Sequence, residues 1–317
     1  MDSGIGVSSA NSYGEEFEIA QSEGKRKLIR YTGKQTSVTV PQGVEAIGEY
    51  AFEGCTSLMS ITLPHGVTTI ERGAFENCTD LREVVIPESV VSIGASVFYG
   101  CTELRRISIP NGIAEIAEST FEDCAQLRSL SIPNGVPSIG KRAFADCTGL
   151  TGISIPSSVT AIEERAFAGC TKLLSVTLPN GVLSIGEKAF FGCTRLKSLT
   201  LPESLKTIGL CAFGGCTRLA GVTIPSGVTS FGSFAFFECK SLMSVVISEG
   251  AMQIGNSAFC GCESLKSAVI PNSVLSAGMR SFANCRELES VTIPKRFRKE
   301  CKELFEGCKR VKFTFTK

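Results

Sequence analysis

Tryptophan is absent from this chain, histidine occurs once and tyrosine four times. The single histidine, His65, stands between Pro64 and Gly66 in a predicted turn, so a catalytic triad that requires histidine has no better candidate base. The glycine-rich stretches recur with the period described below and indicate turns rather than phosphate-binding loops. A lectin that stacks sugar rings on aromatic side chains is disfavoured as well. We therefore expect no enzymatic activity and no cofactor.

An excess of one charge is also missing, because 32 Lys and Arg balance 31 Asp and Glu for a net charge of +1. Nucleic-acid binders and polybasic membrane proteins depend on surplus positive charge, so neither partner is expected. No apolar run is long enough to span a bilayer, which argues against membrane insertion. The first residues show neither a basic n-region nor an apolar h-region, so no signal peptide is expected in the chain as given. A secreted protein whose signal had been removed would look the same.

What the chain does contain is a repeat of 23 residues. Twelve cysteines recur at this interval from Cys55 to Cys308 without a slip. A strict repeat of this length is typical of a solenoid, in which each repeat buries its apolar side chains by stacking on its neighbours. Such an array needs no second core. We predict a disordered start and N-terminal cap over residues 1–32, a twelve-repeat solenoid over 33–308 and a C-terminal capping strand over 309–317.

Residues 56–78 illustrate one repeat. Alternating apolar residues predict a short strand that ends at Pro64, since a proline inside a parallel ladder would remove a hydrogen-bond donor. A turn, a second apolar pair ending at Ile70 and a Gly-x-x-Ala-Phe segment follow. Phenylalanine closes this segment in all twelve repeats, which predicts aromatic stacking along the core. The small residue before it suggests a helical turn. Because four of the twelve repeats replace the glycine, we predict ordinary negative φ at that position. The replacing residues are Glu71, Ala117, Glu163 and Cys301.

The cysteines occupy one position in each repeat, so their side chains run parallel at the separation of neighbouring strands, about 4.8 Å. A disulfide requires Cβ atoms that converge to about 3.8 Å. We therefore expect buried thiols that donate weak hydrogen bonds to the backbone of the turns. A zinc site is the alternative, although metal-binding cysteines usually come in close pairs.

Function is expected in the positions that vary between repeats, because the constant positions form the core. Phe191, Leu210, Phe234 and Phe237 replace small or polar residues on three successive repeats, and exposed aromatic side chains grouped in this way are typical of a protein contact site. The alternative is that they fold down over the surface or make an oligomer contact. The oligomeric state itself is not predicted.

Two basic groups are weaker candidates for an anionic partner. Like charges stacked at strand spacing repel, so each group needs acidic neighbours or a ligand. Glu83 and Glu103 are available to neutralise the first group. The first group comprises Arg82, Arg105, Arg106 and Arg128, and the second comprises Lys172, Arg195 and Arg218.

The outward strand position is almost always Thr, Ser or Val, as at Thr177, Thr200 and Thr223. These residues suit a hydrogen-bonding surface, but they are also simply good strand formers. Near the C-terminus the repeat becomes strongly charged. Capping explains this region, and a basic docking patch of Lys295, Arg296, Arg298 and Lys299 is the alternative.

The pattern Leu-x-x-Ile-x-Ile/Leu-Pro-x-Gly-Val-x-x-Ile-Gly-x-x-Ala-Phe-x-Gly-Cys-Thr, found for example from Leu173 to Thr194, resembles the BspA-like, or Treponema-type, leucine-rich repeats. The resemblance covers residues 17–308. It implies a leucine-rich-repeat solenoid, a right-handed stack of twelve repeats with a parallel β-sheet and short helical turns, between α/β and mainly β. It also implies adhesion to host proteins or to other cells at a bacterial or protist surface.

Two classes of function therefore remain. The first is a cell-surface or secreted module that binds a protein ligand. The second is an intracellular scaffold in the cytoplasm, which would keep the many thiols reduced.

Overall fold

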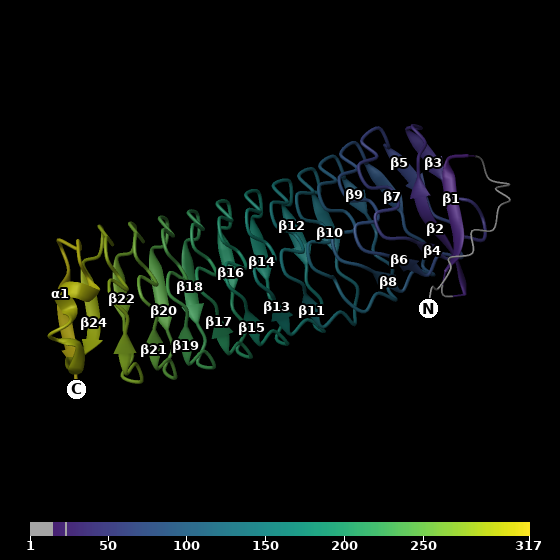
Figure 1. The fold of residues 1–317 in the computed structure, drawn as a ribbon. Helices are drawn as coiled ribbons and strands as arrows, with labels where there is room; N and C mark the ends of the chain where they lie inside the picture. Colours follow the sequence, from purple (N-terminus) through teal and green to yellow (C-terminus); the bar gives the residue numbers. More distant parts are fainter. Residues whose placement is uncertain (1–14, 23) are drawn as a thin grey trace, which may run out of the picture. The chain divides into compact units, whose positions relative to one another are not determined.

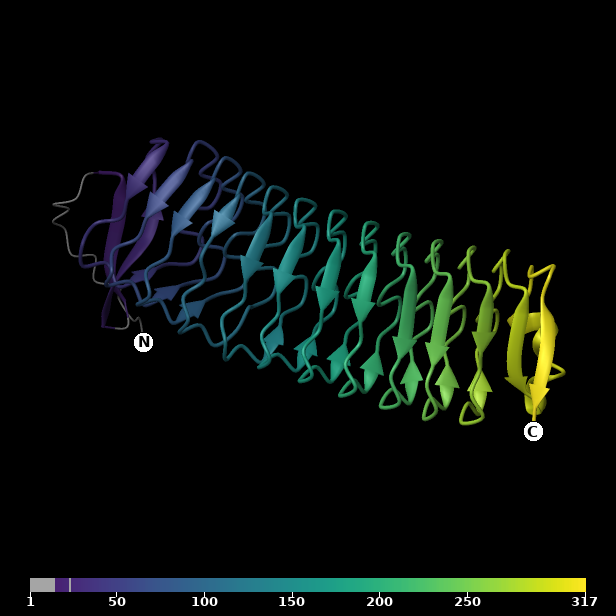
Figure 2. The same ribbon diagram turned by 180° about the vertical axis from the view of Figure 1, so that it is seen from behind.

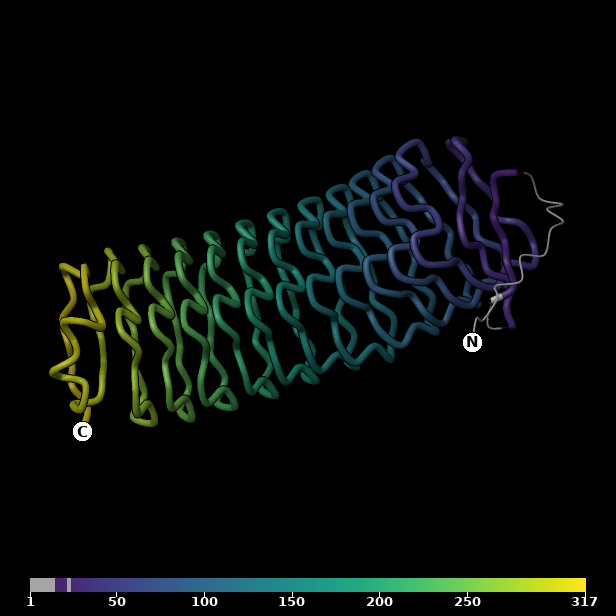
Figure 3. The backbone as a smooth tube through the Cα atoms, in the orientation of Figure 1, coloured from purple at the N-terminus to yellow at the C-terminus, as the bar shows by residue number. Residues whose placement is uncertain are grey.

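The computed structural model describes residues 15–22 and 24–317, so the disordered start expected for the first dozen residues lies outside the described residues. The chain forms two compact units. The first unit ends at Leu150 and the second begins at Thr151. Each unit is built almost entirely from short strands and tight turns, and the backbone of each winds through one coil per repeat (Figure 3).

The first unit begins with an antiparallel hairpin in which Phe17 lies opposite Tyr31. Parallel short strands then continue from this hairpin, in the order β1-β2-β4-β6-β8, and a second series runs in the order β3-β5-β7-β9 (Figure 1). That the hairpin acts as a cap stays a prediction. The strands of this unit are β1 (Phe17–Ser22), β2 (Lys25–Tyr31), β3 (Ser37–Thr39), β4 (Ala46–Ile47), β5 (Ser60–Thr62), β6 (Thr69–Ile70), β7 (Glu83–Val85), β8 (Ser92–Ile93), β9 (Arg106–Ile107), β10 (Ser129–Ser131) and β11 (Ser138–Ile139).

The second unit repeats the same two series, which Figure 2 shows as two rows of arrows. The longer series is β12 (Gly152–Ser154), β14 (Ser175–Thr177), β16 (Ser198–Thr200), β18 (Gly221–Ile224), β20 (Ser244–Ile247), β22 (Ser267–Val269), β24 (Ser290–Pro294) and β25 (Lys312–Thr316). The shorter series is β13 (Ala161–Ile162), β15 (Ser184–Ile185), β17 (Thr207–Ile208), β19 (Ser230–Phe231), β21 (Gln253–Ile254) and β23 (Ser276–Ala277).

Strand register follows the sequence period, because Ser175 pairs with Ser198 and Val176 with Leu199, each 23 residues apart. Residues at the same position of successive repeats therefore form columns. The predicted phenylalanine column is confirmed in each unit. Ring centroids are 5.1–5.6 Å apart from Phe52 to Phe144 and 5.0–5.3 Å apart from Phe167 to Phe305. The solenoid fold follows from this exact repetition.

The cysteines of the main column are thiols packed against the turns. The expected hydrogen bonds are confirmed: the Sγ atom of Cys193 donates to the carbonyl of Phe167 at 3.2 Å, and Cys216 donates to that of Phe190 at 3.3 Å. Burial raises the pKa of Cys216 to about 12 and raises that of Cys193 well above its ordinary value. These thiols therefore stay protonated at neutral pH and act as small apolar side chains.

The helical turn predicted for the Gly-x-x-Ala-Phe segment is wrong in the repeats before the last, where the segment is a tight turn, whereas in the last repeat the equivalent segment is helical. Its third residue has positive φ, for example 53° at Lys188, and an isolated left-handed residue interrupts a right-handed helix. Helix within residues 15–22 and 24–317 is confined to η1 (Lys295–Phe297) and α1 (Cys301–Leu304), so the fold is mainly β.

The predicted negative φ at the first glycine of this segment is confirmed, since Gly186 and Gly209 do not have positive φ. The reason for glycine is contact between repeats. A Cβ on Gly209 would stand 2.6 Å from the backbone nitrogen of Glu187 in the preceding repeat.

The last repeat of the second unit has two arginines with contacts to backbone and to an aromatic ring. The guanidinium of Arg296 donates to the carbonyls of Val274 and Asn272, at 3.1 and 3.2 Å. Arg298 lies 5.5 Å from the ring centroid of Phe315, and Phe313 packs edge-on against Phe305. Two of the four residues of the alternative docking patch thus make contacts within this end of the unit, and that the end acts as a cap stays a prediction.

Candidate functional site

The variable positions of the second unit lie largely on one series of turns, which we call the turn face: the Gly-x-x-Ala-Phe-x segments 186–191, 209–214 and 232–237. The backbone ladder holds these segments in step, because the amide of Lys188 donates to Leu210 and that of Cys211 donates to Ser233, at 2.8 and 2.9 Å. Side chains at equivalent positions are therefore neighbours. An apolar residue that replaces the usual polar residue at one of these positions therefore lies next to the equivalent residue of the next repeat.

The four apolar candidates, Phe191, Leu210, Phe234 and Phe237, all lie on this turn face and form what we call the aromatic patch. Phe191 is 41% exposed, Leu210 38% and Phe234 37%, whereas Phe237 is half-buried. These fractions are high for side chains of this size, so the patch offers apolar area to a partner.

Two local contacts organise the patch. The rings of Phe234 and Phe237 meet edge to face, with centroids 5.6 Å apart and planes at 83°. Phe191 lies over Gly214, since a Cβ on Gly214 would stand 3.1 Å from Cδ2 of Phe191. The expected folding down over the surface therefore occurs for one face of Phe191, while much of the side chain remains exposed.

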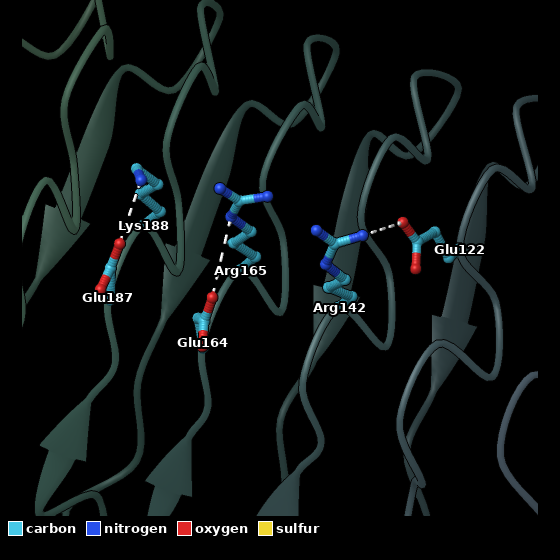
Figure 4. Close-up of polar contacts among 6 residues, drawn as sticks. All are labelled: Glu122, Arg142, Glu164, Arg165, Glu187 and Lys188. Carbon is cyan, nitrogen blue, oxygen red and sulfur yellow. Dashed lines mark hydrogen bonds and ion pairs between the residues drawn. The ribbon is translucent and has the colours of Figure 1, made fainter.

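Charged residues occupy the equivalent turns of several repeats, including the turn 186–191 that carries Phe191 (Figure 4). In the second unit Lys188 pairs with Glu187 at 3.0 Å, and Nε of Arg165 lies 3.9 Å from Glu164. In the first unit Arg142 pairs with Glu122 at 3.2 Å. Surface pairs of this kind contribute at most about 1 kcal/mol, and they leave the turns polar and neutral. Cys211 and Phe234 replace the equivalent of Lys188 in the next two repeats.

Cys211 lies between the basic and aromatic residues of the turn face. Partial burial raises the pKa of its thiol, and the nearby ammonium of Lys188 opposes that rise. The thiol is therefore not activated as a nucleophile. No group of three or more His, Cys, Asp or Glu side chains within the described part of the chain is placed to hold a metal ion.

The first arginine group lies at the start of the longer strands in the first unit. Arg82 and Arg105 are adjacent, since the amide of Arg105 donates to the carbonyl of Arg82 at 3.2 Å. Glu103 pairs with Arg105 at 3.2 Å, and Glu83 lies beside Arg106 in the strand register. The two acidic residues thus lie where they offset much of this positive charge.

The second basic group, Lys172, Arg195 and Arg218, lies at the equivalent end of the longer strands in the second unit. All three side chains are exposed, and none has a carboxylate within 4.0 Å among the described residues. Threonine hydroxyls hold the adjoining turns together: Thr217 donates to the carbonyl of Thr194 at 3.2 Å. This group is hereafter the basic ladder.

An open groove of about 300 Å³ lies on the outward side of β16, β18 and β20. Thr200, Thr223, Ser244 and Val246 contribute to its lining. It forms where the sheet is interrupted, because β16 and β18 belong to separate hydrogen-bonded sheets. Gly221 adds no side chain at a position where Ser198 and Ser244 stand in the neighbouring repeats, which leaves the groove open.

Sequence reasoning placed the patch and both basic groups but missed this groove and the left-handed positions. One signal for the latter was available. The residue before each cysteine of the main column is Gly, Asn or Asp except at Glu238, and these are the residues that tolerate positive φ. The groove has only the single glycine at 221 as its sequence signal.

Comparison with known proteins agrees with the repeat pattern. Residues 25–151, 138–250 and 183–312 match the profile described as BspA type leucine rich repeat region, in six copies. A leucine rich cell surface protein from Faecalibacterium prausnitzii is 28% identical, with a TM-score of 0.62 over 96% of this chain and 94% of that one. A leucine-rich repeat protein from Bacteroides ovatus is 26% identical, with a TM-score of 0.64 over 97% of this chain and 100% of that one. No curated protein sequence matches the chain significantly.

Proposed function

Since the chain belongs to the family of BspA-type leucine-rich repeat proteins, we propose that it is a non-enzymatic adhesion module that binds a protein of a host or neighbouring cell at the cell surface. The observation that carries the proposal is the aromatic patch on the turn face of the second unit. Phe191, Phe234 and Phe237 occupy positions that hold small, polar or charged residues in most other repeats.

The cost of exposing the patch supports a binding role. Large apolar side chains exposed to water gain about 1.5–3 kcal/mol each on full burial, and aromatic residues are enriched among those that dominate protein interfaces. Phe234 also has positive φ of 59°, a conformation that is unfavourable for a bulky residue. The repeat therefore holds this ring at the surface although a serine, as at Ser257 in the next repeat, would suit the same backbone better.

Surface location is supported by likeness. The related Faecalibacterium prausnitzii protein is described as a leucine rich cell surface protein. No helix in the described residues is long and apolar enough to cross a membrane. An intracellular scaffold is the second candidate, supported by the column of thiols. Antibody labelling of intact cells separates the two candidates, because only a surface protein is labelled without permeabilisation.

The patch is tested by binding of the whole chain to immobilised extracellular-matrix and host-surface proteins. The test variant is F191S/F234S/F237S, and the matched control is L183S/M252S/L275S, which removes three side chains of 47%, 49% and 65% exposure elsewhere on the second unit. We expect the test variant to lose at least about tenfold in affinity and the control to stay within about twofold. Circular dichroism and the thermal midpoint confirm that both variants fold.

Equal losses in the two triple variants would contradict the patch as the binding site. Absence of binding to every protein of the panel would contradict adhesion, and partners would then be sought among cytoplasmic proteins.

A further inference from the structure

The basic ladder of the second unit places a cation at the same position of three successive repeats. Some other basic side chains of the unit meet carboxylates, as Lys240 and Arg286 do around Glu263, at 3.9 and 3.8 Å. Lys172, Arg195 and Arg218 lie on three successive repeats, and residues 170–186 and 193–202 contain no acidic residue. Like charges at the spacing of neighbouring strands, about 4.8 Å, repel one another. An external anion would remove that repulsion.

Backbone geometry keeps the ladder regular. The hydroxyl of Thr194 donates to the carbonyl of Thr171 at 3.5 Å and that of Thr217 to Thr194 at 3.2 Å, so the turns just before the three cations are linked one to the next. Lys197 adds a fourth exposed cation at the start of β16. A series of positive charges with constant spacing suits a linear polymer that carries anionic groups at regular intervals.

Two of the three ladder residues, Arg195 and Arg218, precede β16 and β18, and both of these strands line the groove. Its lining includes the hydroxyl groups of Thr200, Thr223 and Ser244, which both donate and accept hydrogen bonds. Gly221 leaves room between them. We propose that the basic ladder and this groove together bind a linear acidic polysaccharide, with sulfate or carboxylate groups on the ladder and sugar hydroxyls in the groove.

Two other polyanions fit less well. Single-stranded nucleic acid is held by stacking bases on aromatic side chains, and the ladder positions and the groove lining include no aromatic residue. An acidic peptide usually adds apolar anchors that fill deep pockets, whereas this groove is open and has Thr200, Thr223 and Ser244 in its lining. Sugar hydroxyls and regular anionic groups match both features of the site.

The test measures affinity of the full chain for heparin, a highly sulfated polysaccharide, by titration calorimetry between 50 and 300 mM NaCl. The ladder variant is K172Q/R195Q/R218Q. Its matched control is R82Q/R105Q/R128Q, which removes the same number of charges from the first unit. We expect about a tenfold loss or more in the ladder variant, a weaker dependence of its affinity on salt, and a change within about threefold in the control.

A second variant tests the groove without altering charge. Gly221→Ser introduces the side chain that Ser198 and Ser244 already carry in this column, so we expect it to fold and to lower heparin affinity several-fold by filling the groove. Unchanged affinity would overturn the part assigned to the groove. A hydroxyl-rich neutral dextran should not bind, since it offers no anion to the ladder.

Three results would overturn the proposal. The first is an equal loss of heparin affinity in the ladder variant and its control, which would indicate general electrostatic attraction without a specific site. The second is no retention of heparin, and none of hyaluronan as a carboxylate probe, at 150 mM NaCl. The third is tighter binding of oligothymidine or polyglutamate of matched charge, which would assign the site to nucleic acid or to an acidic peptide. The aromatic-patch variant should bind heparin normally, so this proposal and the adhesion proposal fail independently.

Discussion

Phe236 and Phe237 are adjacent in the chain, but Phe236 lies in the core and Phe237 lies at the surface. Phe236 is fully buried, with Phe213 and Phe259 stacked on its two sides at 5.2 and 5.3 Å. Phe237 is half-buried at the turn face, where its only described ring partner is Phe234. The first residue belongs to a column that is identical in every repeat, and the second belongs to a column that varies. Repetition fixes the core, and departures from repetition mark the surface on which function depends.

The same contrast separates Cys216 from Cys211. Cys216 lies in the constant inner column, where burial raises the pKa of its thiol to about 12. Cys211 lies in a variable column of the turn face and is only half-buried. Inner columns therefore combine apolar stacking with thiols that must remain neutral, whereas outer columns tolerate charge. The predictions below test this difference between inner and outer columns.

The largest effect is expected from alkali, because it acts on all buried thiols together. A thiol whose pKa is raised in the folded state binds its proton more tightly than in the unfolded state. Its contribution to stability is complete below the ordinary pKa of 9.0 and is lost as the pH rises towards about 12. Each such thiol removes about 1.4 kcal/mol per pH unit in this window. We expect the urea midpoint to hold up to pH 8.5 and to fall steeply between pH 9 and 11.

Substitution identifies the source of that loss. C193A/C216A should flatten the dependence of the urea midpoint on pH, because two inner thiols no longer ionise. Cys211→Ala should leave it nearly unchanged. Stability that stays constant to pH 11 in the original chain would show that the inner column does not exclude the thiolate.

Truncating the paired phenylalanines is expected to have the next largest effect. Phe236→Ala leaves a cavity within the aromatic stack and should lower the free energy of unfolding by about 3–5 kcal/mol. Phe237→Ala removes a surface contact and should cost about 1 kcal/mol or less. Urea denaturation of the two variants measures the difference. Similar losses would mean that Phe237 is part of the core and is not available to a partner.

Much of the fold could be predicted from the sequence because each inner position is repeated twelve times. The buried phenylalanines, the strand register and the thiol hydrogen bonds all follow from one period. The turn conformation could not be predicted so readily. A small residue before Phe190 is compatible both with a helical turn and with the observed tight turn, and the left-handed residue, Lys188, has a side chain with no preference for that conformation.

The candidate site was only partly predictable. The aromatic patch appears in the sequence because each of its members breaks a repeating position. The contrast between the first basic group, which has acidic neighbours, and the second, which has none among the described residues, does not appear in the sequence. The carboxylates that face Arg105 and Arg106 become evident only from strand register and side-chain geometry. The groove depends on the interruption between β16 and β18, which no residue type predicts by itself.

The smallest expected effect concerns Glu238, which lies beside the patch in the same repeat as Phe237. Its φ is +53°, whereas Gly192, Gly215 and Gly261 occupy the equivalent left-handed position in nearby repeats. A side chain in this conformation crowds the following carbonyl and costs roughly 1–2 kcal/mol. Glycine removes that strain but increases the freedom of the unfolded chain. We expect Glu238→Gly to raise the free energy of unfolding by about 0.5–1 kcal/mol.

Ser233→Gly is the control, because Ser233 lies in the same repeat without positive φ and should lose about 0.5–1 kcal/mol on the same change. Thermal unfolding measures the change in stability of each variant. A gain for Glu238→Gly together with a loss for Ser233→Gly would locate strain at Glu238, and a change of the same sign in both variants would contradict it. Binding then sharpens the comparison between core and surface. If Glu238→Gly gains stability and loses affinity for the protein partner, the carboxylate belongs to the rim of the patch, since the strained residue would then contribute to binding and not to stability.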